Sequence, residues 1–456
     1  MRKLYLFILP LLVIFYSCKT PENAQPVEEK PVEPANIEQA RPVAEYLDSL
    51  GVATHIGFAR LPYNQNFDEI IKPRLQELGI KHIRTDLSGQ KFYFQHMKEL
   101  GAMGIKANVV TRPQTGMTLD ALMKNLKTLG DMAISVEGPN EQDGSQNTGK
   151  GKPIYQGKFY PEGLELFQNK LYETINSDSE TQDIKVVAPS FFTKNITEAY
   201  SMLGKLKCDL NNIHSYPAGR GMTTRGLDTM GGALNNALEF CGEDKPIIAT
   251  ETGYHNAIYV RGKNHNDEKS AGTGVSEAAA GKYINRLFLN YFNRNIERTY
   301  IYELIDKNPD PSLSETKNHW GLLRNDGSRK PSFIALRNAI AILSEDNTTS
   351  TEPINNKLGF NLSGNTANVR HTLLQKQDGR FYLALWQEVD SYDRVRLQDI
   401  AVEPVNLQLF IDEDVREVNF YDPLQQRNAI KQVTGENSLE VAVSDRPIFL
   451  EIVIDN

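Results

Sequence analysis

The most constraining feature of this sequence is a regular alternation of short β-rich runs with amphipathic helical segments. Between the runs, apolar residues recur at helical spacing, and helical segments end in glycine at Leu78-Gly79 and Met103-Gly104. Eight such βα units predict a parallel sheet with helical crossovers, and eight units close into a (β/α)8 barrel, which we place at residues 45–346. The eight predicted strands are 52–58, 80–87, 105–111, 133–137, 184–190, 210–216, 246–251 and 299–303.

The competing fold for this pattern is an open, doubly wound sheet. That fold usually places a glycine-rich phosphate-binding turn after its first strand. Here the first strand is followed by Ala59-Arg60-Leu61-Pro62-Tyr63-Asn64, which contains no glycine. The turn therefore favours the barrel.

A second domain is predicted after the barrel, at residues 351–456. The helical period ends near residue 345, and alternating strand runs follow at 381–386, 405–411, 418–421, 439–443 and 447–454. Asp378-Gly379 is typical of a tight hairpin turn. We expect an antiparallel β-sandwich that covers and stabilises the barrel, with Trp386 in the sandwich core; glycan binding by the sandwich stays open.

The N-terminus has the pattern of an exported bacterial lipoprotein. Arg2 and Lys3 precede an apolar run over 4–16, which is too short to span a membrane. The run ends at Ser17-Cys18, which resembles a lipoprotein cleavage site, so we expect a signal peptide at 1–17 and a lipid on Cys18. Residues 18–44 are rich in Pro, Glu, Gln and Asn and predict a flexible tether. An ordinary signal peptide is the alternative. The first reading predicts an outer-membrane lipoprotein that faces the periplasm or the cell surface.

Composition excludes several classes of protein. Fifty Lys and Arg residues against 58 Asp and Glu give a formal net charge of −8, which offers no basic surface for nucleic acid. The three cysteines show no zinc-binding spacing, and the eight histidines form no HxH or HExxH motif, so no metal or other cofactor is expected. Cys208 and Cys241 could pair in an oxidising compartment or remain two buried thiols. We expect a monomer.

Polar and aromatic side chains gather at the carboxyl ends of the predicted strands, where barrel enzymes place their active sites. They include Arg84, Asp86, Asn108, Arg112, Glu137, Asn140, Glu141, His214, Tyr216, Glu251, Tyr254, Tyr302 and Glu303. One such carboxylate would be unremarkable, because acidic residues often cap the next helix. Carboxylates on two opposite strands are what glycosidic bond cleavage requires: one acid protonates the leaving oxygen and one carboxylate attacks the anomeric carbon.

This arrangement resembles the clan A retaining glycoside hydrolases. Asn140-Glu141 after strand four is similar to the clan's acid/base pair, Glu251 at the end of strand seven to its nucleophile, and His214-x-Tyr216 on strand six to the residues beside that nucleophile. The resemblance implies hydrolysis of a β-linked polysaccharide or oligosaccharide with retention.

The same resemblance assigns supporting roles. Asn140 would hold the sugar 2-hydroxyl, Tyr216 would donate to Glu251, His214 would contact sugar hydroxyls or Glu251, and Arg84 would lie under the nucleophile and lower its pKa.

The last strand departs from the clan pattern. It ends in Tyr302 and Glu303 where many members have a tryptophan. Trp320 in the following loop or Tyr302 would then stack on the sugar, Glu303 would be a third acid binding sugar hydroxyls, and His55 would line the floor of the pocket.

Simpler alternatives remain for most of these residues. Glu137 could be the acid in place of Glu141, Glu251 could be a helix cap, His214 and His55 could be core histidines, and Arg84 could form a structural ion pair. For the whole protein, the alternatives are a catalytically silent glycan-binding lipoprotein that uses the same cleft and a metal-dependent barrel hydrolase. The separation of the two carboxylates distinguishes retention, at about 5 to 5.5 Å, from inversion, at roughly 6.5 to 9.5 Å.

Overall fold

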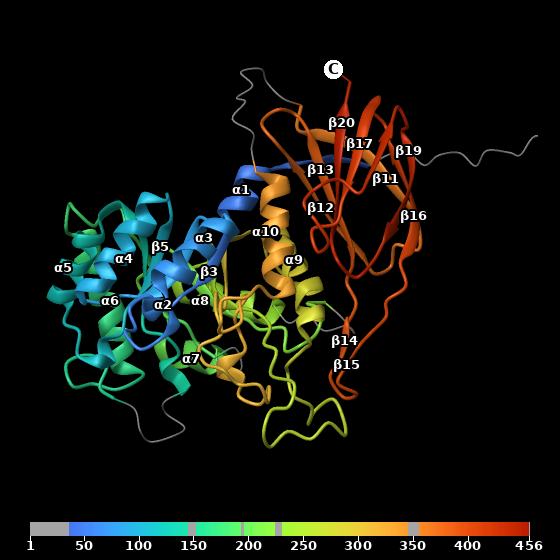
Figure 1. The fold of residues 1–456 in the computed structure, drawn as a ribbon. Coiled ribbons are helices and arrows are strands. Elements are labelled where there is room, and N and C mark those ends of the chain that lie inside the picture. The colour runs from blue at the N-terminus through green and yellow to red at the C-terminus, as the bar shows by residue number, and fades with distance from the viewer. Residues whose placement is uncertain (1–35, 145–151, 193–195, 224–229, 345–354, 456) are drawn as a thin grey trace, which may run out of the picture. The chain divides into compact units, whose positions relative to one another are not determined.

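The computed structural model of the chain describes residues 36–144, 152–192, 196–223, 230–344 and 355–455 (Figure 1). The predicted signal peptide, Cys18 and most of the predicted tether lie outside these residues. Within the described ranges, no helix is long and apolar enough to cross a membrane.

Eight parallel strands form the barrel, in the order β7-β6-β5-β4-β3-β10-β9-β8. A parallel bridge between Val187 and Leu210 joins the two ends of this order and closes the sheet. The predicted barrel is therefore confirmed. Its strands are β3 (Leu50–Ala53), β4 (His82–Asp86), β5 (Lys106–Val110), β6 (Ala133–Glu137), β7 (Lys185–Val187), β8 (Asn211–His214), β9 (Ile247–Thr252) and β10 (Ile296–Ile301).

One long helix follows each strand and covers the outside of the sheet. The strands are largely buried, and β4 and β8 carry polar as well as apolar side chains. Amphipathic helices turn an apolar stripe toward the sheet. The helices are α3 (Lys72–Leu78), α4 (Lys91–Ala102), α5 (Leu119–Leu129), α6 (Glu162–Asn176), α7 (Ile196–Leu203), α8 (Gly231–Cys241), α9 (Glu277–Asn293) and α10 (Pro331–Leu343); two short helices, α1 (Val43–Asp48) and α2 (Pro62–Gln65), flank β3.

The C-terminal domain is the predicted antiparallel β-sandwich. Its sheets have the orders β1-β11-β16-β19 and β18-β17-β20-β13-β12-β2, and a small hairpin, β14-β15, extends from it. The bounds are β11 (Lys357–Gly364), β12 (Val369–Gln375), β13 (Phe381–Gln387), β14 (Tyr392–Asp393), β15 (Gln398–Asp399), β16 (Val405–Ile411), β17 (Val415–Tyr421), β18 (Lys431–Thr434), β19 (Ser438–Val443) and β20 (Ile448–Ile454).

The end of the predicted tether is ordered. Residues 36–39 form β1, which pairs with β11, and Arg41–Pro42 form β2, which pairs with β12. Composition predicted these residues as flexible because they contribute little apolar surface. The free edges of two sheets supply their backbone hydrogen bonds instead.

The expected place of Trp386 is wrong. Its side chain is fully buried, but it packs with the barrel helices rather than between the two sheets. The whole of β13 is buried, one face against the sandwich core and the other against the barrel. A strand buried on both faces has no alternation that could reveal which core a side chain joins.

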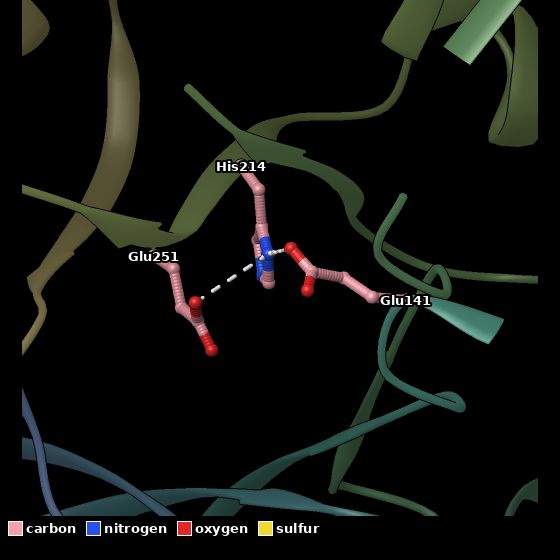
Figure 2. A group of neighbouring side chains, drawn as sticks. All are labelled: Glu141, His214 and Glu251. Atoms are coloured by element: carbon pink, nitrogen blue, oxygen red, sulfur yellow. Dashed lines mark hydrogen bonds and ion pairs between the residues drawn. The ribbon is translucent and has the colours of Figure 1, made fainter. Parts of the chain in front are cut away.

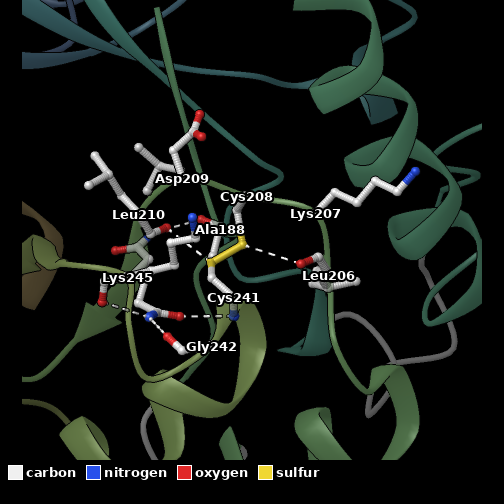
Figure 3. The surroundings of a disulfide bond; sticks show 12 residues. Ala188, Leu206, Lys207, Cys208, Asp209, Leu210, Cys241, Gly242 and Lys245 are labelled. Atoms are coloured by element: carbon white, nitrogen blue, oxygen red, sulfur yellow. Dashed lines mark hydrogen bonds between the residues drawn. A yellow bond between two sulfur atoms is a disulfide. The ribbon is translucent and has the colours of Figure 1, made fainter. Parts of the chain in front are cut away.

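Cys208, just before β8, and Cys241, the last residue of α8, form a disulfide (Figure 3). Their Cα atoms are 5.4 Å apart across a separation of 33 residues. This resolves the alternative that the sequence left open, and it fits an oxidising compartment.

Candidate active site

Two glutamates face each other at the carboxyl end of the barrel, with His214 between them (Figure 2). Glu251 lies in β9, and Glu141 lies in the loop after β6. One oxygen of each carboxylate and one His214 nitrogen lie within 4.8 Å of one another. The nearest oxygens of the two acids therefore converge on one region of the barrel mouth.

The backbone around Glu141 is constrained. Its φ is 46°, in the left-handed region that non-glycine residues rarely adopt, and its N–H donates to the Ser190 carbonyl at 2.9 Å. Asn140 forms a parallel bridge with Ser190 in the loop after β7. The loop after β7 therefore fixes the direction in which Glu141 points.

Cationic and phenolic groups surround the carboxylate of Glu251. Arg84 Nη1 donates to Oε1 at 2.6 Å, and the Tyr216 hydroxyl donates to Oε2 at 2.8 Å. Burial alone would raise the pKa of Glu251, but the charges of His214 and Arg84 and the Tyr216 hydrogen bond outweigh burial and lower it to about 2. Glu251 is therefore ionised at neutral pH, as a nucleophile must be.

The side chain of Arg84 is buried and bonds to residues at the ends of two other strands, β6 and β9. Its Nε and Nη2 donate to the two Glu137 oxygens at 2.7 and 2.8 Å, and Nη2 also donates to Asn140 Oδ1 at 2.6 Å. The sequence left open whether Arg84 forms a structural ion pair or contacts Glu251. In the structure it does both, because it pairs with Glu137 and with Glu251.

Glu137 does not reach the cleft. Its side chain is fully buried, and it also accepts from Asn108 Nδ2 at 2.9 Å and from the Thr250 hydroxyl at 3.2 Å. The structure therefore supports Glu141 over Glu137 as the acid that faces a substrate.

His214 is buried and bonded on both ring nitrogens. Nδ1 lies 2.8 Å from Glu141 Oε1 and 3.7 Å from Glu251 Oε2, while Nε2 lies 2.9 Å from the Thr250 hydroxyl. Burial would lower the pKa of His214, but the two carboxylates raise it above its usual value. His214 therefore contacts both acids. The sequence indicated a contact with Glu251 but not the one with Glu141.

The cleft itself is a cavity of about 260 Å³. It brings together six of the predicted site residues, His55, Arg84, Asn140, Glu141, Glu251 and Tyr302, with Asp86 and Arg112. β3 ends at Ala53, five residues earlier than predicted, so His55 lies in the loop above the strand. There its Nδ1 bonds to Asp86 Oδ2 at 3.0 Å, and its Nε2 lies 3.3 Å from the Tyr302 hydroxyl.

The prediction that Glu303 is a third acid at the mouth is wrong. Glu303 is fully buried, and its Oε2 accepts from the Tyr63 hydroxyl at 3.0 Å and lies 3.4 Å from His55 Nε2. Its pKa is raised by burial, which outweighs the nearby His55 and Lys307. β10 ends at Ile301, and Tyr302 alone of the next two residues lines the cavity.

Trp320 lies among the aromatic side chains beside Glu251. Its ring centre is 4.9 Å from that of Tyr216, 4.8 Å from that of His255 and 5.9 Å from that of Tyr302. Trp320 and Tyr302 are both partly exposed, and of the two only Tyr302 lines the cavity.

Sequence reasoning missed Tyr63, Thr250 and Lys307. Thr250 left a signal, because it is a polar residue inside the apolar run of β9. Tyr63 lies in the one-turn helix α2 and Lys307 in a loop, and neither segment is long enough for a period to indicate the direction of a side chain.

Solved glycoside hydrolases share this fold. A family 39 glycoside hydrolase from Bacteroides cellulosilyticus WH2 superposes with a TM-score of 0.59 at 16% identity, covering 91% of this chain and 81% of that one. A GH39 enzyme from Xanthomonas axonopodis pv. citri gives 0.55 at 12% identity, covering 95% and 100%, and a glucosidase from Croceicoccus marinus gives 0.55 at 10%, covering 92% and 99%.

No protein-family model and no curated protein matches the sequence. At these identities the structural likeness shows the fold alone. It extends over nine-tenths of the chain, so the fold that the clan A resemblance implied is confirmed: a (β/α)8 barrel followed by a β-sandwich.

Proposed function

We propose that this protein is a retaining glycoside hydrolase that cleaves β-linked polysaccharide or oligosaccharide by double displacement. The observation that carries the proposal is the pair Glu141 and Glu251, whose carboxylate oxygens approach within 4.8 Å in an open cavity. Two convergent carboxyl groups allow one carboxylate to attack an anomeric carbon whose leaving oxygen the other protonates. The glycoside hydrolase fold and the clan A motifs support the same reaction and the β-linkage.

In the first step, Glu251 attacks the anomeric carbon and forms a glycosyl-enzyme ester. Arg84 and Tyr216 hold the carboxylate ionised and oriented for that attack. Glu141 gives its proton to the glycosidic oxygen, so the leaving sugar departs as an alcohol. Oε1 of Glu141 lies 2.8 Å from His214 Nδ1, and this hydrogen bond holds the carboxyl group in place.

In the second step, Glu141 removes a proton from water, and the resulting hydroxide attacks the anomeric carbon and releases Glu251. Asn140, held by Arg84, is placed to bind the 2-hydroxyl of the sugar. Tyr302, His55 and Trp320 supply the walls for the sugar ring.

Assays of Glu251→Ala and Glu141→Ala against 4-methylumbelliferyl β-glycosides and a β-glycan panel test this proposal. We expect turnover to fall by at least about a thousandfold in Glu251→Ala. Glu141→Ala should lose far less on the 4-methylumbelliferyl substrates, whose good leaving group needs little protonation. Glu162→Ala, an exposed acid on α6, is the matched control and should match the wild type. Unchanged turnover in either active-site variant would reject the assignment.

Glu141, His214 and Glu251 are also a donor set that a divalent ion could use. The proposed reaction needs no metal, so dialysis against EDTA should leave turnover unchanged. Loss on dialysis with recovery on adding zinc or manganese would instead support the metal-dependent alternative.

We also propose that the mature protein is anchored to the bacterial outer membrane through a lipid on Cys18 and faces the periplasm or the cell surface. The apolar run before Ser17-Cys18 supports this, and the Cys208–Cys241 disulfide is consistent with an extracytoplasmic compartment. Cys18→Ser should release the protein from the membrane fraction. The proposal would be contradicted if the Cys18→Ser variant stayed in the membrane fraction and the purified wild-type protein carried no lipid.

A further inference from the structure

A segment of the sandwich extends toward the loop after β9 (Figure 1). We call residues 388–399, which include the β14-β15 hairpin, the sandwich arm. Its base is fixed to α9 and to the loop after β8: Glu388 Oε1 accepts from Arg286 Nη2 at 2.7 Å and from the Met222 N–H at 2.8 Å. Asp390 accepts from the Gly221 N–H at 3.0 Å.

Arg394 is the residue of the arm that enters the barrel loops. Its side chain is only 7% exposed, its Nη2 donates to Glu268 at 3.0 Å, and its Nη1 donates to the Gly272 carbonyl at 3.1 Å. His265 bonds to the Arg394 carbonyl at 2.8 Å. Glu268, Gly272 and His265 all belong to the loop between β9 and α9, so one sandwich residue binds that loop at three points.

The packing around Arg394 is close enough to require glycine. Gly219, in the loop after β8, has a φ of 78°, and a Cβ there would lie 2.7 Å from Arg394 Cδ and 2.6 Å from the Thr273 carbonyl. The arginine stem is therefore held between the loops after β8 and β9.

The β9–α9 loop in turn is linked through a series of contacts to the aromatic side chains beside Glu251, which are those of His255, Trp320 and Tyr216. Thr273 bonds through its hydroxyl to His255 Nε2 at 2.8 Å, and the His255 ring contacts Trp320. Trp320 packs against Tyr216, whose hydroxyl donates to Glu251. Contacts thus run without interruption from the sandwich to the nucleophile.

We infer that Arg394 is a positioning residue for the active site, which acts through the loop between β9 and α9. Arg394 touches no reacting atom. It fixes the loop that places His255 and Trp320, and through them the substrate and the orientation of Tyr216. This inference rests on the proposed function for its kinetic consequence, but its structural consequence can be measured without any substrate.

The chain has two tryptophans, Trp320 at the wall and the fully buried Trp386, so acrylamide quenching of fluorescence reports mainly on Trp320. We expect Arg394→Ala to raise the quenching constant about twofold and to lower kcat/KM on the best 4-methylumbelliferyl β-glycoside about tenfold. Arg394→Lys, which keeps the charge beside Glu268, should recover part of both effects. In a Trp320→Phe background the increase in quenching should vanish.

Arg396→Ala is the matched control, because Arg396 lies on the same arm, is 75% exposed and, among the described residues, forms its ion pair with the neighbouring Asp393 at 3.1 Å. It should match the wild type in both measurements. If folded Arg394→Ala matches Arg396→Ala in quenching and in kcat/KM, or loses only thermal stability, the inference is overturned. If Arg394→Ala fails to fold, Arg394→Lys is compared with Arg396→Ala instead, in quenching and in kcat/KM. If the wild type cleaves no glycoside, the proposed function fails, while quenching still decides the role of Arg394.

Discussion

Replacing Glu137 by glutamine should weaken the fold, whereas replacing Glu141 by glutamine should weaken catalysis. Glu137 is fully buried and receives two hydrogen bonds from Arg84, one from Asn108 and one from Thr250. Glutamine has nearly the same shape but carries no charge and turns an NH2 group toward these donors.

The magnitude follows from the buried ion pair. Removing one partner of such a pair costs about 3 to 5 kcal/mol. Arg84 keeps Glu251 and Asn140 as partners, so we expect the lower end, about 3 kcal/mol. For a barrel of roughly 300 residues, whose unfolding entropy is about 0.6 kcal/mol/K, this lowers Tm by about 5 °C.

Glu141→Gln supplies the comparison. The carboxylate of Glu141 is partly exposed in the cleft and makes one described side-chain hydrogen bond, to His214, so its loss should change the free energy of unfolding by no more than about 1 kcal/mol. Scanning calorimetry and turnover are measured on both variants. A stable, inactive Glu137→Gln beside an active Glu141→Gln would refute this reasoning and make Glu137 the acid.

Three further predictions follow from the same contacts. Tyr216→Phe removes a hydrogen bond to the charged form of Glu251, so the pKa of Glu251 should rise by about 1 to 2 units. Activity is present above that pKa and lost below it, so the acid limb of the kcat/KM profile should move to higher pH. An acid limb at the same pH as in the wild type would contradict the contact. Replacing Cys208 and Cys241 together by serine should lower the free energy of unfolding by about 3 to 4 kcal/mol in denaturant titrations; equal stability would mean that the disulfide does not constrain the unfolded chain. Trp320→Ala should raise KM more than it lowers kcat, and an unchanged KM would exclude Trp320 from the sugar-binding wall.

The barrel could be predicted because its determinants are local. Strand and helix periods, glycine at helix ends and the order of the motifs depend on neighbouring residues only. Asn140-Glu141 and Glu251 follow from the same order, since the carboxyl ends of parallel strands lie on one side of a barrel.

The direction of single side chains near strand ends could not be predicted. β10 stops at Ile301, so Tyr302 faces the cavity while Glu303 is buried against Tyr63, and no sequence period extends into that turn. Pairings between distant segments were equally hidden. The contact of Arg394 with the β9–α9 loop and the ordering of residues 36–42 on the sheet edges depend on tertiary structure, which one sequence does not display.

The central claim is that Glu141 and Glu251 act together on one anomeric centre, and the stereochemistry of the first product tests it most directly. Proton NMR of a β-glycoside during hydrolysis, recorded before mutarotation, should show the β-anomer of the released sugar appearing first. Early appearance of the α-anomer would mean inversion and would contradict the proposed double displacement by Glu141 and Glu251.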